Sequence, residues 1–506
     1  KRILIDYGME QGRDVYENIR VPCAPSEIDY VFLTHAHIDH SGLLPLLYAG
    51  GFRGEIHATQ ATVSLCQIML RDSAHIQEFE AEWRNRKAKR SGGDIYTPLY
   101  TMQEALGSLE HFVPHPYGEK ISIADGITIR FLDAGHLLGS SSIEIWLEEN
   151  GISKKLLFSG DIGNFHQPLI RDPQYADTAD YVIMESTYGN RLHEKPKNYI
   201  QDFVQILLET FQRGGSVIIP SFAVGRTQEL LYFLKQIKDQ NLLGKYQDVP
   251  IYVDSPLAIE ATEIFQRNKE SCFDEEALAY VQRGENPIGV SGLRTAVTSE
   301  ASMAINTDTR SKIVISASGM CEAGRIKHHL KHNLWKPENT ILFVGYQAVG
   351  TLGRRLLEGA NYVTLFGESV KVAAQIRQLQ GMSGHADQKG LELWIQHVQQ
   401  VKKVFVIHGE TTAADTFTEL LNEQGISAYA PYSGTEFDVA SGQFLHEAEP
   451  VYLEKPKSVK ASATYDRLQI ALDRVTAYIQ NARGYSNKEL AKMADQLTQL
   501  CNKWEQ

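Results

Sequence analysis

A chain of 506 residues with 43% hydrophobic and 22% charged residues has the composition of a globular protein, and its length predicts about three domains or subdomains. The formal net charge of −12 argues against a nucleic-acid-binding function but does not exclude it, because a basic patch or bound metal ions can reverse the local charge. The five cysteines form no CxxC pair, which argues against a thiolate zinc site and a disulfide framework and favours a reducing cytoplasm. No apolar run is long enough to cross a membrane, so we expect no membrane partner.

Short apolar runs that end at polar residues recur along the chain and predict buried strands. The runs at 31–33, 156–158, 181–184 and 404–407 lead to His35, Asp161, Glu185 and His408. Helical stretches lie between many of them, as after Arg226 and after Gln388, so the pattern predicts an α/β fold. Ligand sites in such folds gather at the carboxyl ends of the strands.

Residues from about 70 to 105 predict a charged helix followed by a loop. This helix carries a basic run made of Arg84, Arg86, Lys87, Lys89 and Arg90. The run is either a solvated helix face or a rim that attracts phosphate.

A second α/β block over 197–365 interrupts the first one. Its strand candidates lie at 216–220, 250–254, 312–316 and 340–344. Histidines that could bind metal ions or act beside them resume after this block, at His385 and His408. We therefore interpret the block as an inserted domain. The first domain would then comprise 1–196 and 366–450, followed by a C-terminal helical extension over 451–506, in which residues 464–482 predict an amphipathic helix.

The stretch THAHIDH places three histidines and an aspartate within six positions, a density that favours metal binding. His35 and His37 alternate as in an extension of a strand, whereas Asp39 and His40 follow a turn, so the two pairs can face two different ions. Further candidates at strand ends or in glycine-containing loops are His136, Asp161 and His408. Five histidines and two aspartates without cysteine suit two Zn²⁺ ions per chain, with Asp161 as the candidate bridging carboxylate.

Two metal ions roughly 3.5–4 Å apart can activate a bridging water for in-line attack at phosphorus. The leaving oxygen then needs a proton, and His385 is the candidate donor. Glu185 could hold that imidazole in place and raise its pKa.

Two arginines of the inserted block are candidates for phosphate binding. Arg226 lies at a strand-to-helix turn, where free backbone N–H groups can hold a phosphate, although ordinary helix capping is the alternative. Arg325 precedes a basic, histidine-rich helix that could form a wall facing RNA. A third metal site on that helix is disfavoured, because the adjacent His328 and His329 point to different faces.

The motifs THAHIDH, DAGHLLGSS and FSGDIG resemble those of the metallo-β-lactamase superfamily. MESTYG, MSGHADQ and VIHGE resemble the additional motifs of its β-CASP branch, and the chain looks most similar to bacterial and archaeal relatives of the nuclease subunit of the eukaryotic pre-mRNA cleavage and polyadenylation machinery. The motifs follow the family order from Asp6 to Glu410. The resemblance implies a metallo-β-lactamase αββα sandwich with an inserted α/β β-CASP domain.

The resemblance also implies the roles of individual residues. His35, His37 and His136 would bind one zinc ion, Asp39, His40 and His408 the other, and Asp161 would bridge the two. Asp6 would hydrogen-bond to a metal ligand and orient it. Glu185, His385 and Asp39 would be catalytic residues, and Ser383 would contact a phosphate oxygen. The strand and glycine-rich loop that usually open the family fold are missing or lie before Lys1.

We therefore expect a zinc-dependent ribonuclease of RNA processing or decay that acts on single-stranded RNA, internally, from the 5′ end, or both. A histidine at position 408 goes with RNA-processing members of the family, and a homodimer is an option because dimers are common in it. The alternatives are a small-ester or lactam hydrolase, a catalytically inactive RNA-binding scaffold and a DNA nuclease. The inserted block with Glu185 and His385 argues against the first alternative, and the complete set of ligands argues against the second.

Overall fold

The computed structural model describes residues 1–10, 16, 18, 21–91, 95–193, 198–379, 382–453, 479 and 486–504. Backbone contacts divide the chain into a large unit, 1–13 with 18–449, and a small unit, 14–17 with 450–506. The small unit contains helix α16 (Asn487–Trp504), whereas the amphipathic helix predicted over 464–482 lies outside the described residues apart from Ile479. None of the described helices has both the length and the apolar character that a membrane crossing requires.

Four parallel strands form the first sheet of the large unit, in the order β1 (Ile3–Ile5), β2 (Tyr30–Phe32), β3 (Glu55–Thr59) and β4 (Phe112–His115). Because successive side chains of a strand point to opposite faces, neighbouring residues of β2 enter different cores. Val31 packs under the helices of the outer face, whereas Phe32 faces the second sheet. The helices of that outer face are α2 (Leu44–Ala49), α3 (Gln60–Ser91) and α4 (Met102–Leu109).

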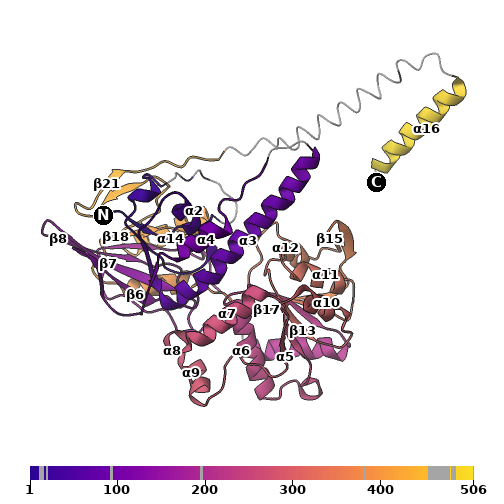
Figure 1. Cartoon of the computed structure of the whole chain (residues 1–506), viewed down its shortest axis with the longest axis horizontal. Coiled ribbons are helices and arrows are strands. Elements are labelled where there is room, and N and C mark those ends of the chain that lie inside the picture. Colours follow the sequence, from indigo (N-terminus) through magenta and orange to yellow (C-terminus); the bar gives the residue numbers. More distant parts are fainter. Residues whose placement is uncertain are drawn as a thin grey trace. The chain divides into compact units, whose positions relative to one another are not determined.

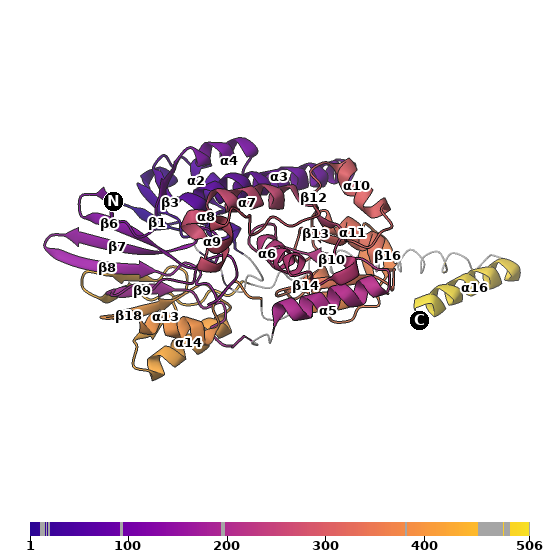
Figure 2. The same cartoon turned by 90° about the horizontal axis from the view of Figure 1, so that it is seen from below.

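Seven strands form the second sheet, in the order β19, β18, β9, β8, β7, β6 and β5. Their bounds are Ala428–Tyr429, Lys403–Val406, Tyr181–Met184, Ile152–Phe158, Ser141–Glu149, Ile127–Asp133 and Ile121–Ala124. Phe131 of β6 and Ile143 of β7 pack with Phe32 between the two sheets. On the other face, Trp394 of α13 (Gln388–Gln396) and Phe417 of α14 (Thr411–Glu423) form a separate core. Helices thus cover both outer faces, which confirms the predicted αββα sandwich (Figure 2, turned by 90° from the view of Figure 1).

The inserted block is a second α/β layer structure around a six-stranded parallel sheet. The strand order is β12 (Leu293–Thr295), β11 (Ile251–Val253), β13 (Ile313–Ser316), β10 (Val217–Pro220), β14 (Thr340–Val344) and β17 (Gln375–Leu379). All four predicted strands are present. Strand β17 lies after the predicted boundary at residue 365 and pairs in register with β14 of this sheet.

Helices and short elements complete the large unit. The helices of the insertion are α5 (Tyr199–Gln212), α6 (Arg226–Asp239), α7 (Pro256–Arg267), α8 (Lys269–Cys272), α9 (Glu275–Gln282), α10 (Ser299–Thr307), α11 (Ile326–Asn333) and α12 (Leu352–Leu357). The antiparallel hairpins pair β15 (Tyr362–Leu365) with β16 (Glu368–Lys371), and β20 (Glu436–Asp438) with β21 (Gln443–His446). Short 3-10 helices lie at Pro25–Glu27 and Gly244–Tyr246.

Helix α3 is longer than the charged helix predicted from about residue 70. It begins at Gln60, because its first turns carry apolar residues such as Leu65 and Leu70 that are buried in the core of the first domain. Farther along, α3 lies against α7 of the insertion (Figure 2). One helix therefore contributes to the core of the sandwich and also contacts the inserted domain.

Candidate metal centre

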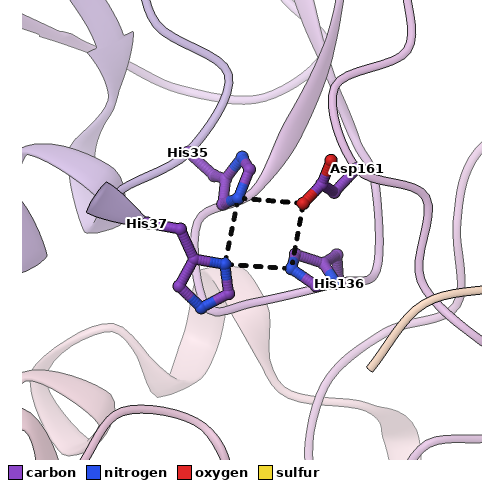
Figure 3. Close-up of side chains that lie close together, drawn as sticks. All are labelled: His35, His37, His136 and Asp161. Atoms are coloured by element: carbon purple, nitrogen blue, oxygen red, sulfur yellow. Dashed lines mark hydrogen bonds and ion pairs between the residues drawn. The ribbon is translucent and has the colours of Figure 1, made fainter. Parts of the chain in front are cut away.

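Four side chains from three separate loops form the first cluster (Figure 3). Nδ1 of His37 lies 3.1 Å from Nε2 of His35 and 3.1 Å from Nε2 of His136. Oδ2 of Asp161 lies 3.4 Å from Nε2 of His35 and 3.5 Å from Nε2 of His136. Neighbouring ligands of a tetrahedral zinc ion with bonds of about 2.0–2.1 Å lie about 3.3 Å apart, so this square of atoms has the dimensions of such a site.

A second cluster lies on the other side of the same carboxylate. Nε2 of His408 lies 3.2 Å from Nε2 of His40 and 3.7 Å from Oδ2 of Asp39. Oδ1 of Asp161 lies 3.3 Å from Nε2 of His40, so each carboxylate oxygen of Asp161 faces one cluster. The sequence predicted these seven residues as metal ligands, and the structure brings all of them together.

The backbone at the strand ends explains this arrangement. His35 follows β2, His136 lies between β6 and β7, Asp161 follows β8 and His408 follows β18, all at one edge of the sandwich. His37 is the N-cap of a short helix, α1 (Ile38–Ser41), so Asp39 and His40 lie in a helical turn rather than after a simple turn as the sequence suggested.

Backbone conformation adds to this local arrangement. His408 has a φ of 47°, a left-handed conformation that costs energy in a residue other than glycine. Asp6 shares this conformation, with a φ of 55°. Such strain in non-glycine residues is concentrated at functional sites, and here both residues adjoin the clusters.

Hydrogen bonds behind the clusters set which imidazole nitrogen keeps a lone pair. Oδ2 of Asp6 lies 2.7 Å from Nδ1 of His40 and accepts a hydrogen bond from the hydroxyl of Thr34. Since a carboxylate only accepts, His40 must carry its proton on Nδ1, and its Nε2 is left to bind a cation. The hydroxyl of Thr34 has used its proton on Asp6, so at 3.1 Å it accepts from Nδ1 of His35 and leaves Nε2 of that ring free as well. Asp6 therefore lies where the sequence predicted and orients one ligand of each cluster.

The charge states also suit a cation. Burial lowers the pKa of His37 to about 3, so the ring is neutral at physiological pH. Burial alone would raise the pKa of Asp161, but the surrounding histidines, His408 and His40 foremost, hold it well below its usual range. The buried Oδ1 of Asp161 nevertheless accepts no hydrogen bond from a described residue. A neutral imidazole in the first cluster and an ionised carboxylate with an orphaned oxygen are donors that suit a metal ion. In the second cluster the carboxylate of Asp161 raises the pKa of His40 and His408 against the effect of burial, so a metal ion there would displace protons from these rings.

The pair of His385 and Glu185 adjoins the first cluster. Nδ1 of His385 lies 3.3 Å from Oε1 of the buried Glu185, and the His385 ring centroid lies 4.4 Å from that of His136. Burial lowers the pKa of His385, but the carboxylates of Glu185 and Asp161 outweigh this effect and raise it to about 9. Glu185 is itself held by backbone N–H donors from Ile162 and Thr187. The His385 ring is therefore positively charged at neutral pH and is held beside the candidate metal ligands.

The loop that carries His385 is held by residues that the sequence analysis missed. Nε2 of His193 donates to the carbonyl oxygen of His385 at 2.9 Å, and the backbone N–H of His193 donates to Asp387. Gln388 donates from its side chain to the carbonyl oxygen of Gly189. One feature of the sequence could have indicated these contacts. The motif MESTYG continues into NRLH, which places further polar residues after the end of the strand.

The residues predicted to contact phosphate have other partners. The guanidinium of Arg226 pairs with Glu229 and donates to the carbonyl oxygen of Met382, and the adjoining helix start is capped by its own side chains. The guanidinium of Arg325 donates to Asp254 and to the carbonyl oxygens of residues 296 and 297. These partners occupy some donors of each guanidinium, and the phosphate contacts of both arginines stay predictions.

Two further predictions near the site have different outcomes. His329 is fully buried with Nε2 at 2.6 Å from Asp254, so it forms no part of a wall facing RNA. Ser383 accepts from the backbone N–H of His385 within its own loop, and its phosphate contact stays a prediction.

Comparisons with known proteins agree with this architecture. The Metallo-beta-lactamase superfamily matches residues 1–182, the Beta-Casp domain matches 227–356 and the Zn-dependent metallo-hydrolase RNA specificity domain matches 369–431. The chain is 36% identical over 427 residues to Ribonuclease TTHA0252 of Thermus thermophilus, covering 84% of this chain and 91% of that protein.

Two archaeal relatives are also similar. An RNase J-like protein of Methanocaldococcus jannaschii is 32% identical over 438 residues, covering 86% of this chain and 93% of that protein. Transcription termination factor FttA of Methanosarcina mazei is 30% identical over 426 residues, covering 81% of this chain and 64% of the factor. The chain therefore belongs to the β-CASP branch of the metallo-β-lactamase superfamily.

Proposed function

We propose that this protein is a metal-dependent ribonuclease that hydrolyses phosphodiester bonds of single-stranded RNA. The observation that carries the proposal is that Asp161 turns one oxygen to each of two ligand clusters, beside a charged His385. The match to an RNA specificity domain and the similarity to Ribonuclease TTHA0252 support RNA as the substrate. The all-nitrogen and oxygen donor set supports zinc as the metal.

The candidate site residues would have the following roles in RNA hydrolysis. His35, His37 and His136 would hold one ion, Asp39, His40 and His408 the other, with Asp161 between them. When bound, two such ions lower the pKa of a water molecule between them and neutralise charge on the scissile phosphate. His385 keeps a proton available on Nε2, because Nδ1 is directed at Glu185, and this proton can pass to the leaving oxygen.

A cleavage assay with one RNA labelled at either end tests this proposal. Versions with a 5′-hydroxyl and a 5′-triphosphate separate internal cutting from trimming that depends on the 5′ end. Asp161→Ala should lose cleavage by orders of magnitude, because both ligand clusters lose their shared carboxylate. The matched control is Asp415→Ala on the exposed face of α14, which should cut at the rate of the natural protein.

The same assay separates the rival functions. RNA that is bound but not cut by the metal-loaded protein would identify a scaffold. Equal cutting of single-stranded DNA would identify a general nuclease, and turnover restricted to small esters would contradict the proposal. A homodimer and a reducing cytoplasm as the place of action stay predictions, which sedimentation and localisation of a tagged protein can test.

A further inference from the structure

An arginine beside the loop of His385 packs against two aromatic rings that come from different domains. The guanidinium carbon of Arg191 lies 4.4 Å from the ring centroid of Tyr188 and 5.6 Å from that of Tyr346. Tyr188 and Arg191 follow β9 of the sandwich, whereas Tyr346 follows β14 of the insertion. Both distances lie in the range of cation–π contacts, so the two domains together fix the position of one positive charge.

Within the described part of the chain, the guanidinium donors of Arg191 are free. Arg191 is exposed, and its side chain makes no ion pair or hydrogen bond with any residue that the structure describes. Stacking uses the faces of a guanidinium, whereas its N–H groups point outward in the plane and match two oxygens of a phosphate. Arg226 and Arg325 differ from Arg191, because their guanidinium groups donate hydrogen bonds to carboxylates and carbonyl oxygens.

The position of Arg191 relates it directly to the proposed chemistry. Tyr188 contacts the His385 ring edge to face, with centroids 5.9 Å apart, so a single ring separates Arg191 from His385. The backbone carbonyl of Arg191 accepts the N–H of Gln388 at 3.0 Å, which ties it to the loop of His385. A substrate strand whose scissile phosphate lies beside His385 can bring an adjacent phosphate into this neighbourhood.

We propose that Arg191 binds the phosphodiester next to the scissile one, and that Tyr188 and Tyr346 orient its guanidinium for this contact. The inference rests on the proposed ribonuclease function and adds a substrate contact to that function. In a protein with a net charge of −12, a cation that stacks on two rings and has no acidic partner among the described residues attracts an anion that the strand necessarily carries.

The test compares two substrates that differ in the number of phosphates. A short RNA has a phosphate next to the scissile one, whereas bis(p-nitrophenyl) phosphate has a single phosphate. Arg191→Gln should lower kcat/KM for RNA at least tenfold more than kcat/KM for the small ester, mainly through KM. The slope of log affinity against log salt concentration should become shallower by about 0.7, the value for one lost phosphate contact in a single strand.

Two further variants control for charge and packing. Arg191→Lys keeps the charge but loses the planar fork, so it should recover only part of the RNA affinity. Arg283→Gln removes an arginine that also stacks on a tyrosine, at 4.6 Å from the Tyr280 ring, but that is paired with Glu285, and it should match the natural protein on both substrates. Metal content and the melting temperature of each variant should stay at the natural value.

The outcomes separate this inference from the proposed function. Equal losses of kcat/KM on both substrates, or an unchanged salt slope for binding of a hydrolysis-resistant phosphorothioate RNA, would overturn the role of Arg191. Failure of the natural, metal-loaded protein to cut any RNA would instead contradict the proposed function, while the binding measurement would still decide the role of Arg191.

Discussion

At the scale of single residues, the candidate ligands lie at strand ends, whereas their hydrogen-bond partners come from other parts of the fold. Each ligand lies in a short polar string directly after an apolar strand, so composition and order were enough to select His35 or His408. The partners depend on contacts across the fold. The hydroxyl of Thr34 joins Asp6 and His35 only because β1 and β2 pair in register. The partners of Arg226 and Arg325 were likewise invisible in the sequence, because they come from segments far along the chain.

Replacement of Thr34 tests the hydrogen-bond relay behind the first cluster. Thr34→Val keeps the shape of this buried residue but removes the hydroxyl between Asp6 and His35. We expect metal affinity to fall by about 10–100-fold, the usual effect of losing a partner that orients a ligand. Titration in metal buffers measures the affinity, and Thr34→Ser should restore it. Equal affinities for the Val variant and the natural protein would show that the relay does not matter.

The pH dependence of cleavage tests the pairing of His385 with Glu185. His385 can donate a proton only below its pKa, which the carboxylates of Glu185 and Asp161 raise against the effect of burial. Glu185→Gln removes one of these charges, so the pKa of His385 falls and the alkaline limb of the rate profile should move to lower pH. A limb that stays in place or moves to higher pH, with the metal content intact, would contradict the assignment of His385 as the proton donor.

At the scale of elements, strand ends rather than helices position the site. The strands β2, β8, β9 and β18 were predicted from their apolar runs, and each ends where a functional side chain begins. The sequence did not predict that the segment after β9 would hold the loop of His385. That contact joins residues 192 positions apart in the chain, which no local pattern encodes.

Replacement of His193 tests this contact between two loops. His193→Phe preserves an aromatic ring against Tyr188 but loses the hydrogen bond to the carbonyl oxygen of His385. Because the loop is then less firmly held, we expect kcat for RNA to fall by about 10-fold or more while the metal content stays unchanged, since small misplacements of catalytic groups are costly. Single-turnover kinetics measures the chemical step. Loss of metal instead of kcat would show that His193 supports the ligands and not His385.

At the scale of the whole molecule, the two-domain plan of the large unit was predictable because the insertion has its own alternation of strands and helices. The place of β17 in the inserted sheet is not visible in the sequence, since β17 joins that sheet only by pairing with β14. The early start of α3 was missed for a similar reason: its first turns are apolar and follow β3 without a break, and burial in the core keeps them helical.

Metal removal should destabilise the whole large unit, because the ligands come from segments far apart in the chain and no such site exists before folding. Ions at a hundredfold excess over Kd stabilise a folded state by about 2.7 kcal/mol, so the melting temperature should rise when metal is added back to the chelated protein. Asp161→Ala should show little of this rise. An equal rise in that variant would mean that the ions bind elsewhere.

The most direct measurement of the central claim is anomalous diffraction from crystals of the metal-loaded protein. We predict two peaks per chain that share Asp161, one at His35, His37 and His136 and the other at Asp39, His40 and His408. A single peak, or two peaks that do not both contact Asp161, would contradict the two-metal centre from which the proposed ribonuclease activity is derived.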